Sequence, residues 1–180
     1  MNLKTLVVSA FLALAFVSCK NDKKEEAPAA EAKPQTYNVM VDLIIKKDDD
    51  LLLFFKDGSN AWFDENHIVW ATVKGSDQVQ TVTFNLPEGV LMTDMRLDIG
   101  RDEFKGQEPV ELKKITFQYL NNRFEINQDQ ISNSFEPNQY ITFDPATKLY
   151  SFKKDEKGNY DPFFVAKSNV WVDIRRVAGL

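Results

Sequence analysis

From Tyr37 onward, apolar side chains recur at every second position in short segments that are separated by turn residues. The first segment alternates with more polar neighbours, and its apolar positions are Tyr37, Val39, Val41, Leu43 and Ile45. A period of two places successive side chains on opposite faces of an extended chain, which is the pattern of a strand with one buried face. An amphipathic helix would need a period near 3.6 instead. The alternation therefore predicts a fold built from half-buried strands.

About ten strands are expected in a domain over residues 37–180, and Gly, Pro, Asn and Asp turns separate them at intervals of about ten residues. After the first, the expected strands are Leu51–Phe55, Ile68–Val73, Val82–Leu86, Met95–Ile99, Val110–Leu120, Arg123–Ile126, Tyr140–Phe143, Lys148–Phe152, Phe163–Val165 and Val170–Val177. Many short strands with polar turns predict an all-β fold. Unequal loops without a strict repeat favour a two-sheet antiparallel β-sandwich of the jelly-roll kind.

Two local features refine this prediction. The apolar phase of Val110–Leu120 changes between Leu112 and Ile115, which predicts a β-bulge or bend within that strand. Little helix is expected, and Asn127–Asn133 has room for one helical turn at most.

Composition excludes several classes of protein. The chain has 180 residues, of which 43% are hydrophobic and 27% charged, values typical of a globular chain and not of a disordered or collagen-like one. A net charge of −5 argues against general nucleic-acid binding, which needs a basic excess. One Cys excludes an intramolecular disulfide, and one His with one Cys excludes the usual zinc clusters. We therefore expect no cofactor and no metal.

The N-terminus has the pattern of a secretory signal peptide. Residues Met1–Lys4 carry one positive charge, and Thr5–Ser18 is an uncharged, mostly apolar run. A helix that spans the hydrocarbon core needs about 20 apolar residues, so this run is short for a permanent anchor. A charged start, a short apolar middle and a small residue at the end predict a signal peptide over residues 1–18.

The end of this run, Phe16-Val17-Ser18-Cys19, resembles a bacterial lipobox in its looser form without Leu at the first position. The resemblance implies cleavage before Cys19 and acylation of both its thiol and the new amino terminus. The acyl chains of Cys19 would then insert into the lipid bilayer and hold the protein on it. We therefore expect a bacterial envelope lipoprotein of the outer membrane. The alternative is that Cys19 merely ends a hydrophobic helix.

Residues 19–36 are expected to form a flexible charged linker that follows the lipidated cysteine. Lys, Glu, Ala and Pro dominate this segment, and such a composition buries too little surface to offset the entropy of ordering. The charged start, Lys20–Glu26, resembles the lysine-plus-acid export signal of surface lipoproteins of the Bacteroidota. A solvated charged spacer is the alternative, so the choice of leaflet stays open.

Several short motifs of the domain resemble those of jelly-roll β-sandwich domains similar to carbohydrate-binding modules. In chain order they are Ala61–Ile68, Phe84–Gly89, Met95–Gly100, Val110–Ile115 and Gly158–Phe163. One departure is that Ile99 stands where Pro usually follows the Asp. The resemblance implies a non-catalytic module with a role related to sugars.

Five residues are candidates for binding a ligand. Trp62 offers a flat apolar ring on which a pyranose can stack, and Asp64 and Glu65 in the same loop can bind hydroxyl groups. Arg96 and Asp98 are two positions apart in an expected strand, so they share a face and can also bind vicinal hydroxyls. The alternative for Arg96 and Asp98 is a structural pair.

Other chemistry-bearing residues have structural interpretations. Trp70 and Trp171 lie within expected strands and are expected to pack, and His67 is expected to be an ordinary, partly buried residue. The acidic segments Asp48–Asp50 and Asp102-Glu103 lack the spacing of a calcium loop and are expected to be solvated turns.

The sequence thus favours a membrane-anchored, non-catalytic binding module, with a glycan or polysaccharide as the expected ligand. The alternative is a structural or accessory lipoprotein that binds a protein partner in the envelope. A more distant alternative is a hydrolase with paired carboxyl groups, which would lie about 5–9.5 Å apart in one cleft. No catalytic residue is predicted.

Overall fold

The computed structural model describes residues 35–101 and 106–180. The predicted signal peptide (1–18), Cys19 and nearly all of the predicted linker (19–36) lie outside the described residues. Eleven strands and two helices form in the described part of the chain. They are β1 (Asn38–Ile45), β2 (Asp49–Lys56), β3 (Ile68–Val73), β4 (Ser76–Asn85), β5 (Asp94–Asp98), β6 (Glu111–Tyr119), β7 (Asn122–Asn127), α1 (Gln128–Ser134), β8 (Phe135–Pro137), β9 (Ile141–Asp144), β10 (Leu149–Phe152), β11 (Phe163–Ala166) and α2 (Ser168–Ala178).

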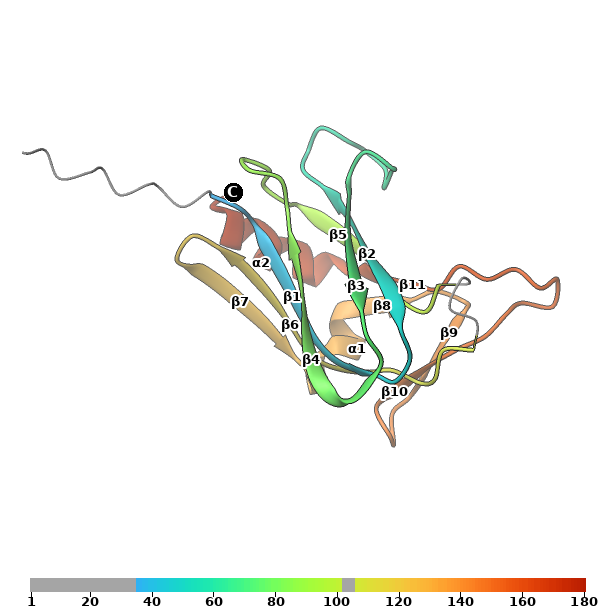
Figure 1. Cartoon of the computed structure of the whole chain (residues 1–180). Coiled ribbons are helices and arrows are strands. Elements are labelled where there is room, and N and C mark those ends of the chain that lie inside the picture. Colours follow the sequence, from blue (N-terminus) through green and yellow to red (C-terminus); the bar gives the residue numbers. More distant parts are fainter. Residues whose placement is uncertain (1–34, 102–105) are drawn as a thin grey trace, which may run out of the picture. The chain divides into compact units, whose positions relative to one another are not determined.

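The strands form two main antiparallel sheets (Figure 1). One sheet has four strands in the order β4-β1-β6-β7, and the other has five in the order β3-β2-β5-β11-β8. Strands β9 and β10 form a separate two-stranded hairpin. The predicted all-β fold, an antiparallel β-sandwich of about ten strands with little helix, is confirmed.

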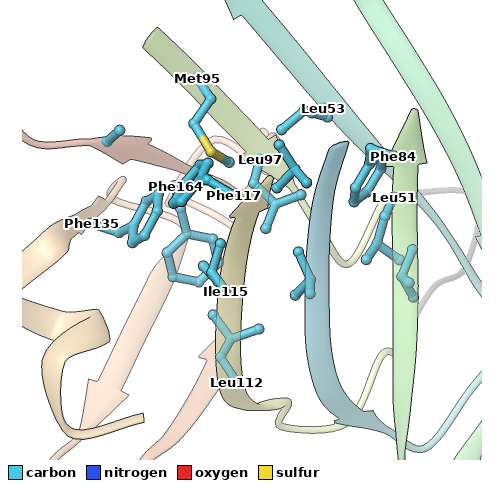
Figure 2. Packing of buried hydrophobic residues seen from close by; sticks show 14 of the residues in the cluster. Leu51, Leu53, Phe84, Met95, Leu97, Leu112, Ile115, Phe117, Phe135 and Phe164 are labelled. Carbon is cyan, nitrogen blue, oxygen red and sulfur yellow. The ribbon is translucent and has the colours of Figure 1, made fainter. Parts of the chain in front are cut away.

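One continuous core fills the space between the two sheets. Figure 2 shows side chains from β2, β4, β5, β6, β8 and β11 packed together. The largest fully buried side chains include Tyr37, Phe84, Phe117, Phe135 and Phe164. Burying aromatic rings of this size adds substantially to the hydrophobic stabilisation that the Val, Leu, Ile and Met residues of the core supply.

The predicted bulge lies in β6. Asp42 of β1 pairs with Lys114, and the next residue of β1, Leu43, pairs with Leu112, so Lys113 is the extra residue. The bulge allows Leu112 and Ile115 to face the core although three positions separate them. The phase change in the sequence is therefore explained by a register shift.

Two crossovers between the sheets lie against each other. The chain passes from β1 to β2 and returns from β3 to β4 through Gly75. Asp48 ties the two crossovers together, since its carboxylate accepts hydrogen bonds from the backbone N–H of Gly75 at 2.9 Å and from Nζ of Lys74 at 2.6 Å. A methyl group on Gly75 would lie only 2.4 Å from the carbonyl oxygen of Lys46, so glycine is required here.

The prediction of a strand over Val170–Val177 is wrong, because this segment belongs to α2. The buried positions of α2 are Val170, Ile174, Val177 and Ala178, which follow the helical spacing of i, i+4, i+7 and i+8. The helix packs against β6 and β7, and the hydroxyl of Tyr37 donates to the carbonyl of Ile174 at 3.1 Å. It ends at Gly179, whose φ of 80° provides the left-handed C-cap.

Smaller differences concern short or polar segments. Helix α1 lies where one helical turn at most was expected, but its seven residues form about two turns. Strand β8 was not predicted, because the three residues Phe135–Pro137 end in a proline and carry no periodic signal. The expectation of a solvated turn at Asp48–Asp50 is wrong for its second and third residues: both belong to β2, and Asp49 is fully buried. Asp102 and Glu103 lie outside the described residues.

No helix in the described part of the chain is long and apolar enough to cross a membrane.

Candidate functional site

The loop between β2 and β3, residues 57–67, presents Trp62 to solvent with 81% of its surface exposed. The first half of the loop is fixed by the amide of Asn60. Its Nδ2 donates to the carbonyls of Phe55 at 3.2 Å and Trp62 at 3.0 Å, and its Oδ1 accepts from the backbone N–H of Asp57 at 3.3 Å. The backbone of Trp62 is therefore held while its ring stays in water.

The second half of the loop is organised around Asp64. Its Oδ1 accepts hydrogen bonds from the backbone N–H of Asn66 at 2.9 Å and from Nδ1 of His67 at 2.8 Å. These contacts, the one from His67 above all, hold the pKa of the Asp64 carboxyl below its usual range. The carboxylate therefore stays ionised at neutral pH, beside the exposed Glu65.

A serine, the histidine and two aspartates form a hydrogen-bonded chain in this loop, which sequence reasoning did not find. Ser59 Oγ lies 3.4 Å from His67 Nε2, and His67 Nδ1 lies 2.8 Å from Asp64. The Ser59 hydroxyl donates at 2.6 Å to Asp57, whose pKa is lowered mainly by this bond. These hydrogen bonds connect the two halves of the loop and hold it in shape.

Arg96 and Asp98 share the outer face of the five-stranded sheet, the face opposite the core. Arg96 donates to both carboxylate oxygens of Asp98 at 2.7 Å each, and its Nη2 also lies 3.1 Å from Asp161. The guanidinium is stacked between two rings, 3.8 Å from the centroid of Phe163 and 4.9 Å from that of Phe54. This geometry combines a bidentate ion pair with cation–π contacts.

Burial acts on the Asp98 carboxyl more strongly than its partner does. Desolvation raises the pKa of Asp98, and the hydrogen bonds and charge of Arg96 oppose that rise. Asp161, which the sequence did not connect to this pair, comes from the loop before β11. A partner that lies 65 residues away in the chain leaves no periodic signal in the sequence.

Two further cations on the same face repeat this arrangement. Lys56 Nζ lies 4.5 Å from the centroid of Phe63 and 3.0 Å from Asp94. At the other end of β2, the Arg101 guanidinium lies 4.6 Å from the ring of Trp70, and Nη1 lies 3.9 Å from Asp50. These two aromatic–cation–carboxylate units and the unit around Arg96 make three, which we call together the outer-face strip. Its residues are Phe63, Lys56, Asp94, Phe54, Arg96, Asp98, Phe163, Asp161, Trp70, Arg101 and Asp50.

The other two tryptophans, Trp70 and Trp171, differ in their exposure and in their contacts. Trp70 was expected to pack, but 55% of its surface is exposed on the outer face. Trp171 lies on α2, where its indole N–H donates to the carbonyl of Ala166 at 3.0 Å. This contact gives Trp171 a structural position, whereas Trp70 contributes its surface to the outer-face strip.

The five predicted ligand-binding residues thus fall into two groups. Trp62, Asp64 and Glu65 lie in the β2–β3 loop, and Arg96 with Asp98 lies on the sheet. Within residues 35–101 and 106–180, no hydrogen bond or ion pair joins the two groups directly. Phe63 links the loop to the sheet, because it follows Trp62 in the chain and its ring lies 4.5 Å from Nζ of Lys56 on β2.

Two cavities lie away from these groups. One of about 370 Å³ is lined by residues that include Lys46, Asp77 and Glu111, and one of about 350 Å³ by residues that include Arg123 and Arg176. In the described part of the chain, no group of three or more His, Cys, Asp and Glu residues is arranged to hold a metal ion.

Comparisons of the chain with protein-family models, with curated proteins and with solved structures found no match.

Proposed function

We propose that this protein is a lipid-anchored, non-catalytic binding module of a bacterial cell envelope and that its ligand is a glycan. The observation that carries the proposal is Trp62, an indole ring 81% exposed on a loop whose backbone is fixed by side-chain hydrogen bonds. Leaving an apolar ring of this size in water forgoes about 2 kcal/mol of burial, and a fixed loop gives the ring no route into the core. Such a ring is suited to a partner that covers it.

The surroundings of Trp62 favour a sugar as that partner. A pyranose has an apolar face that packs on an aromatic ring and hydroxyl groups that donate to carboxylates at the edge. Asp64 is held ionised by its contacts, and Glu65 is exposed beside it. In this proposal, both carboxylates accept hydrogen bonds from hydroxyls of the sugar that stacks on Trp62.

The envelope location rests on the N-terminal sequence. A signal peptide over residues 1–18, acylated Cys19 and a charged linker up to residue 36 would tether the sandwich to an outer membrane. A binding module held there meets envelope and extracellular polysaccharides.

Affinity electrophoresis tests the proposal. The soluble domain from residue 33 onward, which is one compact unit, is run through native gels that each contain one polysaccharide: laminarin, mannan, xylan, soluble starch, alginate or polygalacturonate. We expect at least one gel to retard the protein, Trp62→Ala to weaken that retardation at least tenfold, and Trp62→Phe to retain part of it.

The matched control is Val79→Ala, an exposed apolar position on β4 of the opposite sheet. This variant should be retarded like the wild type, and circular dichroism should show both alanine variants folded. If none of the polysaccharides retards the wild type, or if Trp62→Ala and Val79→Ala behave alike, the glycan proposal is wrong.

A further inference from the structure

The outer-face strip repeats one chemical unit three times on a single sheet face. Each unit has an aromatic ring, a cation over that ring and a carboxylate paired with the cation; the cations are Lys56, Arg96 and Arg101. A structural ion pair needs a carboxylate but no ring, and a packed ring needs no cation. The repetition therefore calls for an explanation beyond local stability.

The strip is longer than one sugar ring. Lys56, Phe54 and Leu52 are successive outward positions of β2, and their partners in β5 are Asp94, Arg96 and Asp98. Trp70 of β3 pairs with Leu52 at the far end. Four residues of an antiparallel strand span about 13 Å, so the strip has the length of a short oligosaccharide.

Trp62 extends this length at the near end. It directly precedes Phe63, which covers Lys56 in the first unit of the strip. We take the exposed rings of Trp62 and Trp70 as the two ends of the proposed surface, with Phe54 and Phe163 around Arg96 between them. A linear ligand that lies along β2 would meet an aromatic ring in each unit.

The charges of the strip favour a neutral chain over an acidic one. Three cations face the four carboxylates of Asp50, Asp94, Asp98 and Asp161, which leaves a net charge of −1. An acidic polymer would have to compete with these carboxylates for cations that are already paired. A sugar hydroxyl can instead accept a hydrogen bond from a guanidinium and donate one to the paired carboxylate, so the ion pair stays intact.

We propose that the outer-face strip binds an extended, neutral glycan chain that runs along β2 from Trp62 to Trp70. This inference rests on the proposed function, since it assigns the ligand of Trp62 to a class and extends its site over the sheet. The strip supplies several contacts to successive sugar rings, so affinity depends on chain length.

The experiment combines chain length with variants at the two ends of the strip. The neutral polysaccharide that retards the domain most is partly hydrolysed, and its monosaccharide and size-sorted oligosaccharides are titrated by calorimetry into the wild type, Trp62→Ala and Trp70→Ala. For the wild type, we expect the longest oligosaccharides to bind at least tenfold more tightly than the shortest that bind.

Trp70→Ala should bind long oligosaccharides at least tenfold more weakly than the wild type does and should bind the shortest ones almost equally well. Trp62→Ala should lower the affinity for long and for short oligosaccharides. Trp70 is exposed, so its removal leaves the core intact, and Val79→Ala again serves as the control. The inference is overturned, with the proposed function left standing, if Trp70→Ala binds long chains like the wild type or if affinity is independent of length. Stronger retardation by alginate or polygalacturonate than by every neutral polysaccharide would also overturn it.

Discussion

At the scale of single residues, the most deeply buried charged side chain in the described part of the chain is that of Asp49. It is fully buried at the start of β2 and accepts hydrogen bonds from the backbone N–H groups of Gly100 at 2.7 Å and Asp50 at 2.9 Å. Nε2 of Gln107 adds a contact at 3.2 Å. Despite these donors, desolvation raises the pKa of Asp49 above its ordinary value of 3.8.

A raised pKa makes the protonated carboxyl more favourable in the folded state than in the unfolded state. The contribution of Asp49 to the free energy of unfolding is therefore full below pH 3.8 and is lost as the pH rises through the folded pKa. We expect Asp49→Asn to remove this dependence of the free energy of unfolding on pH. The variant should also lower the free energy of unfolding at pH 7 by about 1–3 kcal/mol, because an amide cannot accept a hydrogen bond from every donor that surrounds Asp49.

Urea denaturation of wild type and Asp49→Asn between pH 3 and pH 7 measures this prediction. Asp98, whose pKa is also raised by burial, is present in both proteins, so the difference between them isolates Asp49. If the free energy of unfolding of the two proteins changed with pH in parallel over the whole range, the prediction would be contradicted.

Part of the candidate site is predictable from single residues of the sequence. The i, i+2 spacing correctly gave Arg96 and Asp98 a common face, because strand geometry fixes that relation locally. It did not connect them to Phe54, Phe163 or Asp161, since these contacts depend on which strands become neighbours. Trp70 shows the same limit: its place in a strand was predictable, but the exposure of its face depends on how the two sheets pack.

At the scale of elements, α2 shows where periodicity misleads. Its sequence has Val170, Val172 and Ile174 at every second position, and β-branched residues favour strands, so both signals indicated a strand. Val172 is nevertheless exposed, and the buried residues keep a helical spacing. The stop signals were present, with two arginines in the last turn and Gly179 after it, and they identify the helix better than a short alternation does.

The β6 bulge shows the opposite case, because the local pattern of apolar residues was sufficient to predict it. Leu112 and Ile115 cannot both face the core of a regular strand, and both are too apolar to be left in water. One extra residue between them resolves the conflict, and the structure has it at Lys113. A sequence thus predicts a register shift when two strongly apolar positions violate the period.

The paired crossovers between the sheets give a prediction at this scale. We expect Gly75→Ala to lower the free energy of unfolding by about 1–3 kcal/mol, because the added methyl group would lie 2.4 Å from the carbonyl oxygen of Lys46 and 2.7 Å from Cα of Lys47. Both neighbours are backbone atoms, so relief requires the β1–β2 crossover to move.

Thermal and urea denaturation of Gly75→Ala measure this effect. The control is Thr83→Ala at an exposed position of β4, which should change the free energy of unfolding by no more than about 0.5 kcal/mol. Equal stability of the two variants would mean that the crossovers are not in close contact in solution.

At the scale of the whole molecule, the proposed binding surface lies on the five-stranded sheet, and the other sheet packs against the opposite face of that sheet. The four-stranded sheet and α2 contribute core residues such as Val41, Phe117 and Ile174. The outer face of the five-stranded sheet can therefore carry charges and exposed rings without loss of the core. The β2–β3 loop contacts that face through Phe63, whose ring lies 4.5 Å from Nζ of Lys56, and we propose on this basis that the groups around Trp62 and Arg96 form one surface.

The proposed membrane attachment depends on a single residue, Cys19. Each buried methylene group of an acyl chain contributes about 0.8 kcal/mol, so several chains on one cysteine hold a protein firmly on a bilayer.

We expect the wild-type full chain, expressed in a Gram-negative host, to sediment with membranes and to have a mass that corresponds to an acylated chain beginning at Cys19. Cys19→Ser should move the protein to the soluble fraction and remove the acyl mass, because no other cysteine is present and the run Thr5–Ser18 is short for a permanent span. Trp62→Ala, which alters only the proposed ligand surface, should sediment like the wild type. Continued sedimentation of Cys19→Ser, or a wild-type mass without lipid, would show that the lipobox interpretation is wrong and would leave the β-sandwich and its ligand surface to be explained without an anchor.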